Sequence, residues 1–239
     1  MRWPLICFDL DNTLYDHERA FNDAMIDCYY FYFYHYESRN NELTAYKWFE
    51  QFKINCDRYW GLYEKKILTA LEYRRLRYKK TVEAFQIPYS DQDADAFHQR
   101  YESIVSYYAA PFPGVHSLFQ FLLKNGILIG VITNGSSKTQ RKKLRELGLL
   151  DLLPDNRLII SEECGIAKPN PKIFELAATN SMKQPPLYVG DSWRLDVEAA
   201  MQAGWEAVFL NTRNETITSN YKPYAICKDF HQVVTVIQS

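Results

Sequence analysis

The chain has 239 residues, of which 47% are hydrophobic and 24% charged, and its formal net charge is -1. This balance gives no electrostatic basis for binding nucleic acid polymers or anionic membranes, and no apolar run approaches the roughly 20 residues that span a bilayer. The five cysteines are odd in number and form no C-x-x-C pair, so we expect a reduced, cytoplasmic protein without a disulfide framework or a zinc site.

The first predicted element is a buried strand at residues 5–9, LICFD, a short apolar run that ends in an aspartate. Between about residues 17 and 108 the apolar residues recur at helical spacing with almost no glycine, which predicts about four helices. This stretch contains the aromatic run from Tyr29 to Tyr36. We interpret the run as the buried face of an amphipathic helix, because tyrosines pack as apolar plates with a polar edge. The alternative is a surface on which bases stack.

A break at residues 111–114, PFPG, precedes a change of pattern. The predicted order is then helix 115–124, strand 127–132, helix 138–147, strand 158–160, a helix from Pro171, strand 187–189, helix 194–203, strand 207–210, a strand near 224–227 and a terminal helix. Strands that alternate with helices predict a parallel sheet covered on both faces. The expected fold class is therefore α/β, with a Rossmann-like core at residues 1–15 and 110–239 and a helical cap domain inserted at residues 16–109.

Polar residues directly follow three of the predicted strands, at the edge where an open parallel sheet binds ligands. They are Asp9 and Asp11 after the first strand, Thr133, Asn134 and Gly135 after the second, and Asp191 and Asp196 after the strand at 187–189, while Lys168 lies in the loop before Pro171. Asp9 and Asp11 point to the same side of an extended chain, about 6–7 Å apart. One carboxylate can then attack a substrate while the other handles the proton of the leaving group.

Several carboxylates at one sheet edge repel each other unless a cation lies among them. The ligand set contains only oxygen atoms, since no histidine or cysteine lies in these loops, and it therefore favours Mg²⁺ over zinc. Lys168 supplies a fixed positive charge for phosphate oxygens. Thr133 and the backbone amides of Asn134 and Gly135 offer donors to an anion. A basic run is interpreted as a solvated helix face: Lys138, Arg141, Lys142, Lys143 and Arg145.

The segments FDLDNT, ITNGS, AKPNPKIF and VGDSWRLD, in this order and spacing, resemble the four motifs of the haloacid dehalogenase superfamily of hydrolases. The resemblance covers residues 5–14 and about 111–210, and the insert resembles the helical cap of that superfamily's first cap class. It implies that Asp9 is a nucleophile that forms an aspartyl phosphate, and that Asp11 is the general acid and then the base. It also implies a Mg²⁺ site made by Asp9, the backbone carbonyl of Asp11 and Asp191. The remaining implied roles are phosphoryl binding by Thr133 and Lys168, and orientation of the metal's waters or of Lys168 by Asp196.

The expected function is thus a Mg²⁺-dependent phosphatase for a small phosphorylated metabolite. The segment SEECGIAKPNPKIF resembles pyrimidine 5'-nucleotidases and related acylneuraminate phosphatases. Because the abundant tyrosines and phenylalanines of the cap can stack a planar base, nucleoside 5'-monophosphates rank narrowly above sugar or acylneuraminate phosphates. The insert leaves the core directly after the nucleophile, and we expect it to be a mobile lid that chooses the substrate.

Two other function classes remain as alternatives. A 2-haloacid dehalogenase, by the family pattern, lacks an acid at the position of Asp11. A binding module with an inactive site would have lost one of the charged residues, and none is missing here. The expected partner is a small phosphate ester, with no nucleic acid polymer and no membrane, and the sequence does not specify an oligomeric state.

Overall fold

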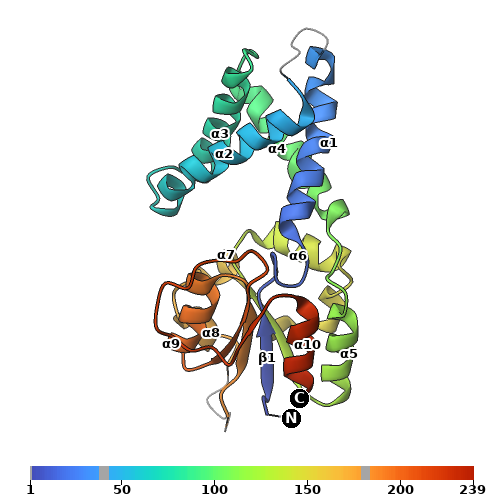
Figure 1. Ribbon diagram of the computed structural model, residues 1–239, viewed down its shortest axis with the longest axis vertical. Helices are drawn as coiled ribbons and strands as arrows, with labels where there is room; N and C mark the ends of the chain where they lie inside the picture. Colours follow the sequence, from blue (N-terminus) through green and yellow to red (C-terminus); the bar gives the residue numbers. More distant parts are fainter. Residues whose placement is uncertain (1, 38–42, 179–183) are drawn as a thin grey trace. The chain divides into compact units, whose positions relative to one another are not determined.

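The computed structural model describes residues 2–37, 43–178 and 184–239, which fall into two compact units. One unit, the core unit, comprises Met1–His17 and Ala109–Ser239, and the other, the helical unit, comprises Glu18–Tyr108. Figure 1 shows a sheet flanked by helices in the core unit and packed helices in the helical unit. Within the described ranges, none of the helices combines the length and the hydrophobicity that a membrane crossing needs.

The core unit is built on a sheet of six strands in the order β3-β2-β1-β4-β5-β6. The strands are β1 Leu5–Phe8, β2 Leu128–Thr133, β3 Leu158–Ile160, β4 Leu187–Gly190, β5 Glu206–Leu210 and β6 Ala225–Cys227. Every neighbouring pair is parallel, which confirms the predicted α/β class. The chain moves from β1 outward to β3 on one side and from β4 outward to β6 on the other. The order therefore reverses beside β1, and a crevice for ligands forms at the carboxyl ends of strands at such a point.

Helices cover both faces of this sheet. Those of the core unit are α5 Val115–Lys124, α6 Ser137–Glu146, α7 Ser161–Cys164, α8 Lys172–Glu175, η4 Trp193–Glu198, α9 Ala199–Gln202 and α10 Phe230–Gln238, with short turns η2 Leu150–Leu152 and η3 Asp155–Arg157. In Figure 1, α5 and α10 lie on one side of β1, and α8 and α9 lie on the other. The alternation along β1 serves both layers: Leu5 and Cys7 pack with Phe174 of α8, whereas the Phe8 ring lies 5.3 Å from that of Phe119 in α5.

Two helices of the core unit are less regular than the sequence predicts. The helix expected from Pro171 is a single turn. Its backbone hydrogen bonds, such as that from Phe174 N to Pro171 O, span three residues, as in a 3₁₀-helix. The helix expected at 194–203 starts as the π-helical turn η4, in which Val197 N donates to Ser192 O across five residues at 3.2 Å. Such π turns occur frequently at functional sites.

The helical unit contains α1 His17–Glu37, which begins one residue before it, and then α2 Ala45–Glu64, α3 Ala70–Ala84, α4 Asp91–Ile104 and the short η1 Val105–Tyr108. Their starts have clear local causes. Thr69 and Glu72 form a reciprocal capping box on α3, and the side chains of Thr44 and Ser90 cap α2 and α4. The prediction of about four helices in this stretch is confirmed.

An aromatic core holds these helices together. Its largest members are Tyr29, Phe33, Trp48, Phe52, Tyr78 and Phe97. The rings of Trp48 and Phe52 stack at 5.1 Å, and Phe97 lies 5.2 Å from Trp48.

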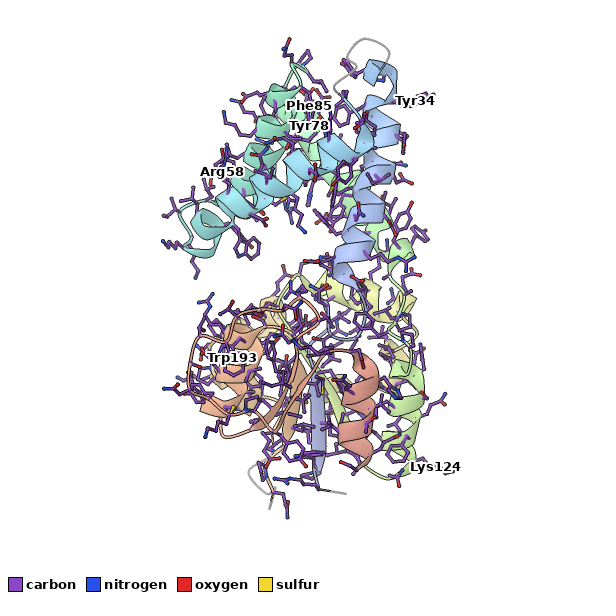
Figure 2. All side chains as sticks on the ribbon, in the orientation of Figure 1. Tyr34, Arg58, Tyr78, Phe85, Lys124 and Trp193 are labelled. Atoms are coloured by element: carbon purple, nitrogen blue, oxygen red, sulfur yellow. The ribbon has the colours of Figure 1, made fainter. Side chains whose placement is uncertain are left out.

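The aromatic run on α1 divides between this core and the surface. Tyr29 and Phe33 are buried, whereas Tyr30, Phe31 and Tyr34 are 52%, 61% and 64% exposed. Figure 2 shows Tyr34 on the outer side of α1. The predicted buried face is thus correct for part of the run only, because consecutive helical residues point about 100° apart and cannot share one face.

Candidate active site

Three carboxylates meet where β1 and β4 end. Asp9 follows β1, and its backbone N donates to Val189 O of β4 at 2.9 Å. Asp191 follows β4 directly, and Asp196 lies in η4. One carboxylate oxygen of each aspartate lies within 4.8 Å of the others, and all three residues are buried. The sheet therefore brings together residues that lie up to 187 positions apart in sequence.

Gly190 allows Asp196 to join this cluster. A Cβ atom at position 190 would lie 2.4 Å from the Cβ and Cγ atoms of Asp196, closer than any real side chain tolerates. Asp196 is further held by the backbone N of Ser192, which donates to its Oδ2 at 2.9 Å. The glycine before Asp191 is therefore required by the close approach of η4 to the strand.

Lys168 lies among these aspartates with all three of its ammonium donors in use. Its Nζ donates to Asp9 Oδ1 and Asp196 Oδ1, both at 2.6 Å, and to the Tyr188 hydroxyl at 3.0 Å. The Tyr188 hydroxyl in turn donates to the backbone O of Ile132 at 2.7 Å. Burial lowers the pKa of Lys168, but the charges of Asp196 and Asp9 outweigh it and hold the pKa above its ordinary value. Lys168 is therefore a fixed cation beside the proposed nucleophile.

Asn134 holds the backbone of this lysine. Its Nδ2 donates to Lys168 O and its Oδ1 accepts from Lys168 N, each at 2.9 Å. Asn134 follows β2, so this reciprocal pair joins the β2 loop to the loop of Lys168. The side chain of Asn134 thus positions the lysine.

Burial makes Asp9 and Asp191 costly to ionise. Burial raises the pKa of Asp9 to about 7 even though Lys168 opposes the effect. Burial together with the charges of Asp196 and Asp9 raises the pKa of Asp191 to about 8. The Arg213 guanidinium donates to Asp191 Oδ2, and the Thr13 hydroxyl donates to Asp191 Oδ1 at 3.4 Å. A further cation among these groups would favour their charged forms.

Asp11 has a different environment. The ammonium of Lys143 contacts both of its oxygens at 2.6 and 2.8 Å, the Tyr15 hydroxyl donates to Oδ1 at 2.5 Å, and Gln140 Nε2 donates to Oδ2 at 3.1 Å. Burial alone would raise the pKa of Asp11, but the charges of Lys143 and His17 outweigh it and hold the pKa well below its ordinary value. Asp11 is therefore ionised in this structure, the form that accepts a proton.

Lys143 corrects the interpretation of the basic run as a solvated helix face. The residue is only 5% exposed. Gln140 and Lys143 are three residues apart on α6 and both reach Asp11, so they lie on the same face of that helix. The buried face of α6 thus carries a cation that belongs to the site.

The predicted anion donors after β2 are engaged by their neighbours. The Thr133 hydroxyl accepts from Gln140 Nε2 at 2.7 Å, and Gly135 N donates to the Ser161 hydroxyl at 3.0 Å. Gly135 has φ +145°, and a Cβ there would lie 3.0 Å from the Gln140 side chain. A phosphoryl oxygen that binds the Gly135 amide would therefore replace the hydroxyl of Ser161.

Five site residues were not identified from the sequence. They are Tyr15, Gln140, Lys143, Tyr188 and Arg213. Arg213 carried a usable signal, since it follows β5 just as the predicted residues follow β1, β2 and β4. Gln140, Lys143 and Tyr188 lie within helix or strand patterns that look ordinary in the sequence, and Tyr15 lies in the segment between β1 and α1.

Comparison with known proteins places these observations in a family. A sequence model described as haloacid dehalogenase-like hydrolase matches residues 3–204. The pyrimidine 5'-nucleotidase YjjG of Escherichia coli strain K12 is 27% identical over 242 residues, which cover 98% of this chain and 97% of that protein. The glyceraldehyde 3-phosphate phosphatase of Methanopyrus kandleri is 37% identical over 103 residues, which cover 42% of this chain and 43% of that protein.

A solved structure agrees with the fold described above. The HAD-hydrolase YfnB from Bacillus subtilis, crystallised with bound magnesium, has a TM-score of 0.80 and 20% sequence identity, with 100% of both chains covered. At this identity the likeness establishes a shared fold.

Proposed function

Because this chain belongs to the haloacid dehalogenase-like hydrolases, we propose that it hydrolyses small phosphate monoesters with the Asp9 carboxylate as nucleophile. The observation that carries the proposal is the pairing of buried Asp9 with Lys168, with a second carboxylate, Asp11, two residues on. Lys168 binds Asp9 Oδ1, and no hydrogen bond from any residue that the structure describes reaches Oδ2. One oxygen is thus held while the other is available to attack.

The reaction would proceed in two steps. Asp9 Oδ2 attacks phosphorus, the bond from phosphorus to the ester oxygen breaks, and the leaving oxygen takes a proton from Asp11. The Asp11 carboxylate then removes a proton from water, the water oxygen attacks the aspartyl phosphate, and the bond from phosphorus to Asp9 breaks to release phosphate. The charges around Asp11 favour its ionised form, so a proton must reach it before it can act as the acid.

Asp11 also argues against carbon–halogen displacement. A halide leaves without a proton, so that chemistry has no use for a carboxylate held by Lys143, Tyr15 and Gln140. A phosphate ester has an alkoxide leaving group, which needs a proton. Thr133, Lys168 and the amides of Asn134 and Gly135 are the proposed phosphoryl ligands.

The donor set fits a hard divalent cation, and we propose Mg²⁺. Asp9 and Asp191 are oxygen ligands at one edge, and burial raises the pKa of both, which a nearby cation would reverse. The backbone carbonyl of Asp11 is the proposed third ligand. Asp196 already uses one oxygen for Lys168 and the other for Ser192 N, so it is assigned an outer, orienting role. The ion would offset the charge of phosphoryl oxygens as the transition state forms.

For the substrate we propose nucleoside 5'-monophosphates. The relative that matches nearly the whole chain is named a pyrimidine 5'-nucleotidase, whereas the glyceraldehyde 3-phosphate phosphatase matches 42% of it. Sugar and acylneuraminate phosphates are the alternative substrate class, and only measured activity on these compounds would favour that class.

A substrate panel with and without metal tests the proposal. We expect the highest kcat/KM on pyrimidine nucleoside 5'-monophosphates, loss of activity in EDTA and recovery with Mg²⁺. Asp9→Asn supplies the matched inactive control. Full turnover by exhaustively chelated enzyme would exclude the metal role, and dehalogenation of a 2-haloacid without phosphatase activity would exclude the reaction. A preference for sugar or acylneuraminate phosphates would contradict the proposed substrate class but would agree with the proposed reaction.

A further inference from the structure

Arg213 lies at the active-site edge although it belongs to none of the motif segments. It follows β5, and its guanidinium donates to Oδ2 of Asp191. The two partners differ in exposure, since the arginine side chain is 39% exposed and that of Asp191 only 6%. One end of this ion pair therefore lies in the buried carboxylate cluster and the other reaches solvent.

The backbone that carries Arg213 is held in place. Asn211 Oδ1 accepts from Glu215 N at 2.7 Å, and Asn211 Nδ2 donates to Glu215 O at 3.1 Å. Glu215 Oε2 in turn accepts from the backbone N of Trp193 at 3.0 Å. The loop is thereby tied to η4, two residues beyond Asp191.

The other cation of the cluster is more deeply buried. Lys168 is 5% exposed, and its three donors are bound to Asp9, Asp196 and Tyr188. The Arg213 side chain is 39% exposed, and it donates to Asp191 of the cluster. A divalent cation on Asp191 would repel a guanidinium held against the same carboxylate, and the exposed partner can yield at the smaller cost.

We propose that Arg213 is the counter-ion of Asp191 in the metal-free enzyme and that a divalent cation displaces it. The inference rests on the proposed function in one respect, the assignment of Asp191 as a metal ligand. Without metal, the guanidinium offsets a carboxylate that would otherwise be buried without a partner of opposite charge on that side. Because the two cations compete for one carboxylate, Arg213 weakens metal binding, and metal binding weakens the ion pair by the same free energy.

Calorimetric titration of the substrate-free protein with MgCl₂ tests this directly. We expect Arg213→Gln to bind Mg²⁺ about 5- to 30-fold more tightly than wild type, within the ordinary range of coupling between two sites. Arg213→Lys keeps the positive charge and should bind within about threefold of wild type. Arg2→Gln is the matched control, because it removes an arginine–carboxylate pair with Glu206 at the start of β5, the opposite end of that strand, and should leave Mg²⁺ affinity unchanged.

Thermal unfolding in EDTA supplies a second measurement. Metal-free Arg213→Gln should unfold at a lower temperature than wild type, and saturating Mg²⁺ should remove the difference. A difference that persists in Mg²⁺ would mean that Arg213 supports the loop alone, and would overturn the proposal.

The titration distinguishes this inference from the metal assignment beneath it. Equal or weaker Mg²⁺ binding by Arg213→Gln, with clear binding by wild type and none by Asp191→Asn, would overturn the role of Arg213 and leave the metal site intact. Absence of Mg²⁺ binding in wild type itself would overturn both.

Discussion

The two units of this protein use their buried interiors in opposite ways. The core unit buries ionisable side chains, among them Asp9, Asp191, Lys143 and Lys168. The helical unit buries aromatic rings around Trp48, and its ion pairs, such as that of Arg75 with Asp95, lie near the surface. Burial of apolar rings stabilises a fold, whereas burial of charges costs stability unless they are paired. The core unit thus gives up stability where its chemistry is expected.

The helical unit also encloses polar atoms, among them Arg77 Nε and Ser106 Oγ, which have no hydrogen-bond partner among the residues that the structure describes. Asn55 donates to the Thr81 hydroxyl at 3.1 Å, and both residues are buried. The buried indole N–H of Trp48 has no hydrogen-bond partner among the residues that the structure describes. Apolar packing therefore accounts for the stability of this unit, and within the described residues the acidic cluster that could hold a metal lies in the core unit.

The largest expected effect comes from Asp9→Asn, which separates activity from stability. An amide is not a competent nucleophile, so phosphatase activity should fall by about 10⁴-fold or more, or about 5 kcal/mol of transition-state stabilisation. The variant also removes a carboxylate that is costly to bury, so at pH 8 in EDTA it should unfold at a higher temperature than wild type. Steady-state kinetics and thermal unfolding measure the two quantities. Retained turnover would contradict the role of Asp9 as the nucleophile, and a lower unfolding temperature would contradict the stability cost of burying its carboxylate.

The aromatic core should show the reverse behaviour. Trp48→Ala removes a fully buried ring and should lower the free energy of unfolding by about 3–5 kcal/mol. Trp60 is 50% exposed and provides the matched control, for which we expect a loss of about 1 kcal/mol or less. Urea unfolding measures both losses. Mg²⁺ affinity of the folded variants, measured by calorimetry, should equal that of wild type. A change in affinity would show that the two units are energetically coupled.

The pH dependence of the metal-free protein isolates the buried carboxylates. Asp9 and Asp191 have pKa values raised by burial to about 7 and about 8, far above the ordinary 3.8. When folding raises the pKa of a carboxyl group, the folded protein loses stability as the pH rises through that raised value. Between pH 6.5 and pH 8.5 in EDTA we therefore expect a loss of about 2 kcal/mol in the free energy of unfolding.

Two other shifted groups, Asp11 and His98, change the stability little within this window. Charges from Lys143 and His17 lower the pKa of Asp11 despite its burial, so its contribution is complete above the ordinary value of 3.8. Burial lowers the pKa of His98 in the helical unit to about 4, so between pH 6.5 and pH 8.5 it adds only about 0.4 kcal/mol of stability, opposite in sign to the carboxylates. Urea unfolding at the two pH values, with and without Mg²⁺, is the measurement. A flat profile in EDTA would contradict the raised values, and Mg²⁺ should flatten the profile if it binds these carboxylates.

The smallest expected effect concerns Lys143, the buried cation that holds Asp11. Lys143→Met should lower kcat by about tenfold with little change in KM, because the proton-handling carboxylate loses its orientation while substrate binding is untouched. Lys143→Arg should recover part of the rate. Lys138→Met, on the exposed side of the same helix, is the control and should behave as wild type. An equal loss in both methionine variants would mean that general positive charge on α6, and not this contact, supports the rate.

Most of the fold followed from local pattern. The strands and helices show as apolar runs, helix caps and glycine breaks that act over a few residues, and their alternation predicts the parallel direction of the strands but not their order in the sheet. The exceptions were the single turn at α8 and the π turn at η4. In the π turn, Ser192 O accepts from both Asp196 N and Val197 N, while Asp196 is engaged by Lys168 from a separate loop. Closure of the insert over the site stays a prediction.

The residues that follow the ends of the strands can be recognised from the amino-acid pattern alone. Asp9, Thr133 and Asp191 could be placed together because parallel strands present their carboxyl ends at one edge, a rule that needs no knowledge of register. The partners that set the charge states of these residues depend on the tertiary structure. Lys143 lies 132 positions from Asp11, and Arg213 lies 22 positions from Asp191. Their roles depend on which face of a helix or which side of a loop docks against the sheet, and packing between distant elements decides that orientation.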